Sequence, residues 1–196
     1  MLAILNNLAV SFDLPILDWI QANLQCSFLD TVMPIITMFG DAGIFWMACA
    51  TLLLFFRKTR RTGLGMWFAM AMGLLVCNII LKPAVGRMRP YDFQKEYFQV
   101  IINLLIEKET SLSFPSGHTI ASFEACTVLL LNGKRMGIPA LILAILIAFS
   151  RMYLYVHYPT DVIFSIFAGI LFAVIGNLIA KKIPLGKLGR KGKFEK

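Results

Sequence analysis

The chain has 196 residues, of which 58% are apolar and 15% are charged, against about 25% charged residues in an ordinary soluble domain. Its mean hydropathy is +0.74. This composition excludes a disordered chain, and a soluble fold this apolar would expose large hydrophobic patches to water. The sequence therefore indicates one polytopic all-α membrane domain. At about 20 residues per span plus loops, five helices fit and there is room for a sixth.

The formal net charge of +8 would suggest a nucleic-acid partner in a soluble protein. Here the basic residues lie mainly in short loops between apolar runs, and no nucleic-acid-binding motif is visible. We therefore expect membrane lipids and not nucleic acid as partners. No basic region precedes the first apolar stretch, so no cleavable signal peptide is expected. The cysteines form no CxxC pair and are expected to be small buried hydrophobes: Cys26, Cys49, Cys77 and Cys126.

Apolar periodicity divides the chain into an N-terminal segment, a core and a tail. Residues 1–27 alternate apolar and polar positions at helical spacing, which predicts an amphipathic helix lying in the membrane interface. The core, residues 28–182, begins with an apolar run over 28–56. Gly40 and Asp41 interrupt this run, so we expect a broken helix whose regular part covers 42–56.

The rest of the core alternates apolar spans with polar loops. Further spans are predicted at 63–82, 117–131, 138–156 and 160–180. In the long loop 83–116, the stretch 97–106 predicts a short amphipathic helix on the membrane surface. A basic tail, residues 183–196, ends the chain.

The distribution of basic residues predicts the orientation of these spans. The loops after the first, third and fifth spans carry 13 Lys and Arg residues, and the opposite side carries six. Residues 1–56 contain four Asp and neither Lys nor Arg. The positive-inside rule then places the tail in the cytoplasm and the N-terminus outside. The loop 83–116 and the turn 150–161 are both expected on the extracytoplasmic side.

Three polar clusters fall on this predicted outer face. They are Lys82 with Arg89-Pro90, then Pro115-Ser116-Gly117-His118, and finally Ser150-Arg151 with His157 and Asp161. Because span counting brings all three to one membrane level, residues far apart in sequence are expected to meet.

The residue types in these clusters suit the binding and cleavage of a phosphate group. Lys82, Arg89 and Arg151 supply three positive charges with no matching carboxylate nearby in sequence, and a phosphate would balance them. The helix that opens after Pro115 can direct its N–H groups at the same anion. His118 and His157 are the only histidines of the chain. Asp161, four residues after His157, is expected to accept the N–H of its ring and to orient the other nitrogen for attack.

The order and spacing of the three clusters resemble those of the type 2 phosphatidic acid phosphatase (PAP2) family, which shares its site with vanadium haloperoxidases. The resemblance implies that His157 attacks phosphorus and that Asp161 orients it. It implies that His118 protonates the leaving oxygen and then activates water, and that the family needs no metal or cofactor. The residues that would bind the phosphoryl oxygens are Lys82, Arg89, Ser116, Gly117 and Arg151.

The chain resembles the short bacterial members of this family that dephosphorylate lipids, including undecaprenyl pyrophosphate phosphatases. We expect hydrolysis of a lipid phosphate or pyrophosphate monoester at the outer leaflet through a phosphohistidine, with undecaprenyl pyrophosphate as the first candidate. Phosphatidate, diacylglycerol pyrophosphate and phosphatidylglycerophosphate remain open as substrates, as does phosphotransfer to another hydroxyl. A non-catalytic lipid transporter is a different class, and the complete set of catalytic residues speaks against it.

Two charged residues lie off the motif. Arg87 is expected to be an ordinary anchor whose side chain reaches to the membrane interface. Glu124 lies inside the predicted span 117–131, where a carboxylate is either functional or held by a structural hydrogen bond. The sequence leaves both interpretations of Glu124 open.

Overall fold

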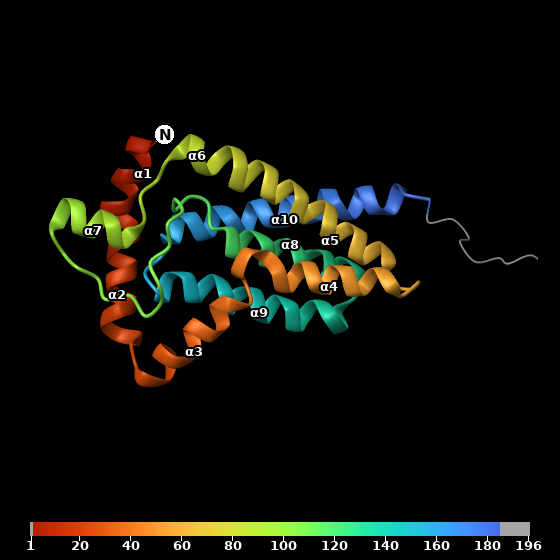
Figure 1. Ribbon diagram of the computed structural model, residues 1–196, viewed down its shortest axis with the longest axis horizontal. Helices are drawn as coiled ribbons and strands as arrows, with labels where there is room; N and C mark the ends of the chain where they lie inside the picture. The colour runs from red at the N-terminus through yellow and green to blue at the C-terminus, as the bar shows by residue number, and fades with distance from the viewer. Residues whose placement is uncertain (1, 185–196) are drawn as a thin grey trace, which may run out of the picture.

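The computed structural model describes residues 2–184, and within this range all regular structure is helical (Figure 1). Five stretches are long and apolar enough to cross a membrane: Leu2–Leu24, Ser27–Phe55, Arg60–Phe98, Lys134–Tyr153 and Pro159–Lys182. The predicted all-helical membrane fold is therefore confirmed. The predicted tail falls mostly outside the described residues, since 185–196 are not among them.

The bundle consists of helices that run lengthwise beside one another (Figure 1). They are α4 (Ile44–Phe55), α5 (Arg60–Gly73), α8 (Gly117–Asn132), α9 (Lys134–Tyr153) and α10 (Pro159–Lys182). Helix α8 has 16 residues, fewer than α9 with 20 and α10 with 24, and both of these helices pack against it. Its first turn therefore lies at one end of the bundle and not far outside it.

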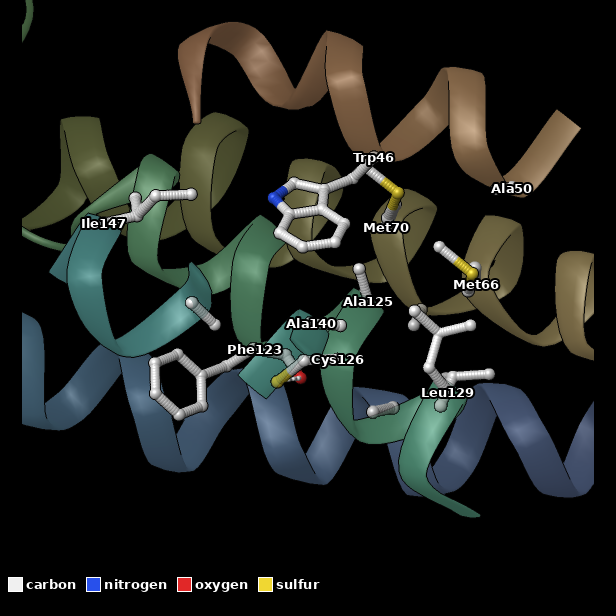
Figure 2. Close-up of a cluster of buried hydrophobic side chains, with 14 of the residues drawn as sticks. Trp46, Ala50, Met66, Met70, Phe123, Ala125, Cys126, Leu129, Ala140 and Ile147 are labelled. Carbon is white, nitrogen blue, oxygen red and sulfur yellow. Dashed lines mark hydrogen bonds between the residues drawn. The ribbon is translucent and has the colours of Figure 1, made fainter. Parts of the chain in front are cut away.

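Small residues let these helices approach closely. A Cβ atom on Gly176 of α10 would lie 2.7 Å from the backbone oxygen of Gly65 on α5. Such small-residue contacts are typical of membrane bundles, in which close packing replaces the hydrophobic effect between helices. Figure 2 shows the core that results, where Trp46, Met66 and Phe123 fill the space between the helices. The indole N–H of Trp46 is satisfied by Ser122 Oγ at 3.0 Å.

The second predicted span continues beyond α5. It runs through a π-helical stretch, η3 (Leu74–Leu81), into the short α6 (Lys82–Val85). It ends at Gly86, whose φ of +65° is a conformation that glycine adopts without steric cost. The helix therefore delivers Lys82 to the end of the bundle where α8 begins.

The N-terminal segment runs across this same end of the bundle (Figure 1). It comprises α1 (Leu2–Leu8), the π-turn η1 (Ala9–Asp13) and α2 (Leu14–Leu24). Its buried side chains pack with the turn that follows α9 in a second apolar cluster. By length and composition this segment could also cross a membrane, so its position in the interface stays a prediction.

The break predicted at Gly40-Asp41 is confirmed. Helix α3 (Ser27–Met38) ends just before it, and a 3-10 turn, η2 (Asp41–Gly43), leads into α4. Ala42 and Gly43 have φ angles of 48° and 68°, which reverse the local helical path. Gly40 also allows a close approach, because a Cβ atom there would lie 2.7 Å from His118 Cδ2.

The surface helix predicted at 97–106 is wrong. The helix in this loop is α7 (Pro90–Phe98), which begins at a proline and ends where Gln99 adopts a positive φ of 57°. Residues 99–116 are not helical. Their apolar side chains Ile102, Leu104 and Ile106 pack on the N-terminal apolar cluster, so burial in that cluster takes the place of a helix on the membrane surface.

Candidate active site

The three polar clusters meet around one cavity of about 450 Å³. The end of the α5–α6 segment provides Lys82, the chain after Gly86 provides Arg89, the first turn of α8 provides Gly117 and His118, and the turn after α9 provides His157. The number of spans between these residues had predicted that they would lie close together. The structure places them at the end of the bundle that the N-terminal segment crosses (Figure 1).

His157 is 1% exposed and presents its two ring nitrogens to different partners. Its Nε2 lies 3.3 Å from Arg89 Nη1, and its Nδ1 lies 3.5 Å from Ser113 Oγ. Nδ1 is 3.6 Å from Asp161 Oδ2, which is too long for a hydrogen bond. Asp161 therefore lies beside the His157 ring as expected, but at a distance longer than a hydrogen bond.

Ser113 stands between the two and completes the connection. Its hydroxyl donates to Asp161 Oδ2 at 2.5 Å, which leaves the Ser113 oxygen able to accept the Nδ1–H of His157. Sequence reasoning missed Ser113. Its position two residues before Pro115 was a usable signal, because the loop that begins α8 must pass beside the turn of His157.

The surroundings of His157 favour its neutral form. Burial lowers the pKa of this imidazole well below its ordinary value, and the positive charges of Arg89 and Arg151 lower it further. A neutral ring keeps a lone pair on Nε2, which faces Arg89 Nη1 at the cavity, and a nucleophile requires that lone pair.

Arg87 is not the interface anchor that the sequence suggested. It is 1% exposed and lies between two carboxylates. Arg87 Nη2 is 2.7 Å from Asp13 Oδ2, and Nη1 donates to Asp161 Oδ1. Its guanidinium also lies over the ring of Tyr158, 3.7 Å from the ring centroid. The prediction failed because these partners are more than 70 positions away in sequence.

Glu109 supplies the carboxylate that the basic cluster lacked in the sequence. Its Oε2 lies 2.5 Å from Arg89 Nη2, and its Oε1 accepts from Arg151 Nη2. Burial opposes ionisation of Glu109, but the positive charges of Arg151 and Arg89 prevail and lower its pKa to about 2. Arg89 and Arg151, which were expected to hold a phosphoryl group, therefore bind the carboxylate of Glu109 in this structure.

The remaining phosphate-binding candidates differ in their access to the cavity. Lys82 lines it, and within residues 2–184 its amine forms no ion pair. Gly117 also lines it. Arg151 is fully buried behind Glu109 and donates to Thr37 Oγ1 at 2.6 Å. Ser116 is fully buried beside α10 and does not line the cavity, since its backbone N–H donates to Ser165 Oγ at 2.9 Å.

His118 contacts a carboxylate that sequence reasoning also missed. Its Nε2 lies 2.7 Å from Oδ1 of Asp41, in the turn between α3 and α4. Asp41 can therefore accept the N–H on Nε2 and orient the ring of His118.

Asp41 is one of four acidic residues among the first 56 residues of the chain, and all four contact the active-site region. Asp18 accepts from Tyr155 Oη and Asp30 from Tyr153 Oη, each at 2.6 Å. Asp13 contacts Arg87, as described above. The sequence held a signal for these contacts. Residues 1–56 are largely apolar and contain four acidic residues but no basic residue, so the acidic side chains need partners elsewhere in the chain.

Glu124 marks the inner part of the cavity. At about 1.5 Å per residue it lies about 9 Å farther along α8 than His118. It is 1% exposed and lines the cavity together with apolar residues such as Met70 and Leu74 of the α5–η3 segment. Within the described residues, Glu124 Oε1 has no hydrogen-bond partner. It contacts the backbone of Gly73 so closely that a side chain there would clash.

A family model described as the PAP2 superfamily matches residues 62–183. The chain belongs to this superfamily. An undecaprenyl-diphosphatase of Sulfolobus acidocaldarius is 30% identical, over 91% of this chain and 84% of the relative. A lipid A 1-phosphatase of Rhizobium etli is 31% identical, over 78% of this chain and 75% of the relative. A PAP2-type phosphatidylglycerolphosphate phosphatase of Bacillus subtilis superposes with a TM-score of 0.63 and 27% identity, covering 87% and 82% of the two chains.

Membership in the PAP2 superfamily identifies the protein as a phosphatase, a hydrolase of lipid phosphates, embedded in the membrane by several spans. The match covers every residue that we predicted for the site, from Lys82 to Asp161. It leaves out the N-terminal segment, α3, η2 and α4, the part of the chain that provides Asp13, Asp18, Asp30 and Asp41.

Proposed function

We propose that this PAP2 phosphatase hydrolyses undecaprenyl diphosphate through a phosphohistidine on His157. The observation that carries the proposal is the form of the cavity, which has cations at one end and mostly apolar side chains, with Glu124 among them, at the other. Lys82 and Arg89 line the end that holds both histidines, and membrane helices form the other walls. Such a cavity accepts a phosphate head attached to a long hydrocarbon chain. The 30% identity to an undecaprenyl-diphosphatase over most of both chains supports this choice of lipid.

The proposed reaction has two steps. His157 Nε2 attacks the terminal phosphorus, and the bond from phosphorus to the bridging oxygen breaks while His118 donates a proton to that oxygen. The N–H on Nδ1 is held by Ser113 and, through it, by Asp161. Water then attacks the phosphohistidine, His118 accepts its proton, and cleavage of the P–N bond releases phosphate.

Positive charge stabilises the oxygens of the pentacoordinate transition state. Lys82 and Arg89 reach the cavity, and Arg151 adds its charge from behind Glu109. We propose that the phosphoryl group takes over Arg89 donors that Glu109 holds in this structure. The backbone N–H of Ser116 is bound to Ser165, so the N–H groups of the first turn of α8, from Gly117 on, add to the field of the cations.

We propose that this site faces the extracytoplasmic side. The α4–α5 turn, the α8–α9 turn and the C-terminal end of α10 lie at the opposite end of the bundle from the site (Figure 1). These three segments carry basic residues, which favour the cytoplasm.

To test the orientation, the native cysteines are first replaced, because Cys26 is exposed. A new cysteine within 99–106 should then react with an impermeant thiol reagent in intact cells, whereas one within 187–196 should not. The reverse pattern would place the site in the cytoplasm.

The substrate is tested by phosphate release from purified protein in detergent. The panel contains undecaprenyl diphosphate, lipid A, phosphatidate, diacylglycerol pyrophosphate and phosphatidylglycerophosphate, each with and without EDTA. We expect the highest kcat/KM for undecaprenyl diphosphate and no effect of the chelator, because Lys82, Arg89 and Arg151 supply the charge that a metal would otherwise provide. Higher kcat/KM for another lipid would reassign the substrate. Activity lost in EDTA and restored by Mg²⁺ would contradict the proposed mechanism.

A further inference from the structure

A series of buried contacts connects the nucleophile to the N-terminal segment. Asp13, in the π-turn between α1 and α2, is fully buried and lies 2.7 Å from Arg87 Nη2. Arg87 donates to Asp161 through its other terminal nitrogen. Asp161 accepts from Ser113, whose oxygen lies 3.5 Å from His157 Nδ1. The contacts therefore lead from a residue outside the family match to the proposed nucleophile.

We propose that Asp13 is a positioning residue for His157. It acts through Arg87, which holds Asp161 and, by way of Ser113, the imidazole. This inference rests on the proposed function, because it assigns a role in the same reaction. Asp13 itself does not line the cavity and does not touch the reacting atoms.

Arg87 binds two carboxylates at once, and this is the physical reason for the role proposed for Asp13. Asp13 occupies Nη2, so Asp161 is left with Nη1 for its Oδ1, and Asp161 Oδ2 remains available to Ser113. Without the charge of Asp13, Nη2 keeps only the backbone oxygen of Leu5 as an acceptor, at 3.0 Å, and Asp161 is the only remaining carboxylate on the guanidinium. Arg–carboxylate pairs favour two parallel hydrogen bonds, so Asp161 would be drawn onto both nitrogens. Its Oδ2 would then leave Ser113.

The partners of Asp13 donate hydrogen bonds to both of its carboxyl oxygens. Thr160 donates to both of its oxygens, through the backbone N–H to Oδ1 at 2.8 Å and through the hydroxyl to Oδ2 at 2.7 Å. With Arg87 as a third donor, an amide N–H₂ group at this position would meet only the Thr160 hydroxyl as an acceptor among these partners, and that oxygen already accepts from Arg87 Nη1 at 2.8 Å. Asp13→Asn keeps the shape of the side chain and should disturb these contacts selectively.

Asp18 offers a matched control in the same segment. It accepts from Tyr155 Oη at 2.6 Å, in the turn that contains His157, but has no contact with Arg87 or Asp161. Asp18→Asn therefore weakens the attachment of the N-terminal segment to this turn and leaves the contacts behind the imidazole in place. Asp30, which accepts from Tyr153 Oη at 2.6 Å, offers a second control of the same kind.

The experiment measures kcat, KM and the rate of phosphoenzyme formation with undecaprenyl diphosphate on full-length protein in detergent. We expect Asp13→Asn to lower kcat about 30-fold with KM within about twofold of wild type, as a misplaced nucleophile would. Asp18→Asn and Asp30→Asn should retain at least half of the wild-type kcat. Asp13→Glu should restore part of the lost kcat.

A double-mutant cycle tests whether Asp13 affects kcat through Ser113. If Asp13 acts through Ser113, then Asp13→Asn combined with Ser113→Ala should lower kcat little more than Ser113→Ala alone. Asp18→Asn combined with Ser113→Ala should lower kcat by the product of the single effects. Should Asp13→Asn fail to fold, Thr160→Ala keeps every charge and should lower kcat about threefold, with the same non-additivity.

Three results would overturn the inference. They are a folded Asp13→Asn variant with kcat within twofold of wild type, equal losses in Asp13→Asn and Asp18→Asn, and strictly multiplicative effects in the Ser113 cycle for the Asp13 or Thr160 variant. Wild-type protein that releases no phosphate from any lipid of the panel would instead refute the proposed function. The two failures are therefore distinguishable.

Discussion

The first 56 residues and the family-matched residues 62–183 contribute to the site in different ways. The matched region carries both histidines and the cations around the cavity. The first 56 residues carry none of these, yet their four aspartates contact Arg87, Tyr155, Tyr153 and His118. The comparison indicates that the matched region provides the reacting groups, whereas Asp13 and Asp41 of the other region contact Arg87 and His118 beside them. The following predictions, from the largest effect to the smallest, test how far this division holds.

Removal of the nucleophile should have the largest effect. His157→Ala should lower phosphate release about a thousandfold or more, because no other side chain can form the phosphoenzyme. Substrate binding should persist, since Lys82 and Arg89 remain at the cavity. Phosphate release and binding of the lipid are measured on the same preparation. Turnover within tenfold of wild type would show that the matched region does not hold the nucleophile at this position.

The effect of His118→Ala should depend on the leaving group. With undecaprenyl diphosphate we expect a loss of about a hundredfold or more, because the bridging oxygen departs without a proton. An activated aryl phosphate, whose leaving oxygen needs no proton, should lose far less. Asp41→Asn should show the same ranking of substrates with smaller losses, since the acid remains but its carboxylate partner is lost. Equal losses on both substrates would assign His118 to binding and not to proton transfer.

Glu109→Gln should change inhibition by phosphate more than it changes turnover. Loss of this carboxylate removes a competitor for Arg89 and Arg151, so orthophosphate and vanadate should inhibit about tenfold more strongly, as expected for one charged hydrogen bond. Inhibition constants of wild type and Glu109→Gln are compared at one pH. Lys108, whose amine pairs with Asp92 on the exposed part of the same loop, provides the control Lys108→Gln. Unchanged inhibition would mean that Glu109 and the phosphoryl group do not compete.

The smallest effect concerns pH. Protonation of His157 removes its lone pair, so kcat/KM should fall as the pH drops through the pKa of this group. Because burial and the neighbouring arginines lower that pKa, the acid limb should lie below about 6.5, the ordinary value for histidine. The pKa of Glu109 is lowered to about 2, so its charge persists across this range and adds no limb of its own. A pH–rate profile of kcat/KM with an acid limb above 7 would contradict the neutral, buried nucleophile.

Several features could be predicted from the sequence because local patterns determine them. Apolar runs long enough to cross a membrane located the helices, since a helix in a bilayer must be apolar over about 20 residues. The interruption at Gly40-Asp41 marked a real break. Counting spans brought Lys82, His118 and His157 to one end of the bundle, because each span reverses the direction of the chain.

The tertiary structure decided which charged groups pair. Asp13 and Arg87 are 74 positions apart, and Glu109 and Arg151 are 42 apart, so no sequence period joins them. Arg87 was taken for a surface anchor, although it is buried between two carboxylates. Hydropathy and spacing specify where a helix begins, ends and crosses the membrane. The partner of a buried charge depends on how helices pack side by side, and that is set by contacts between distant parts of the chain.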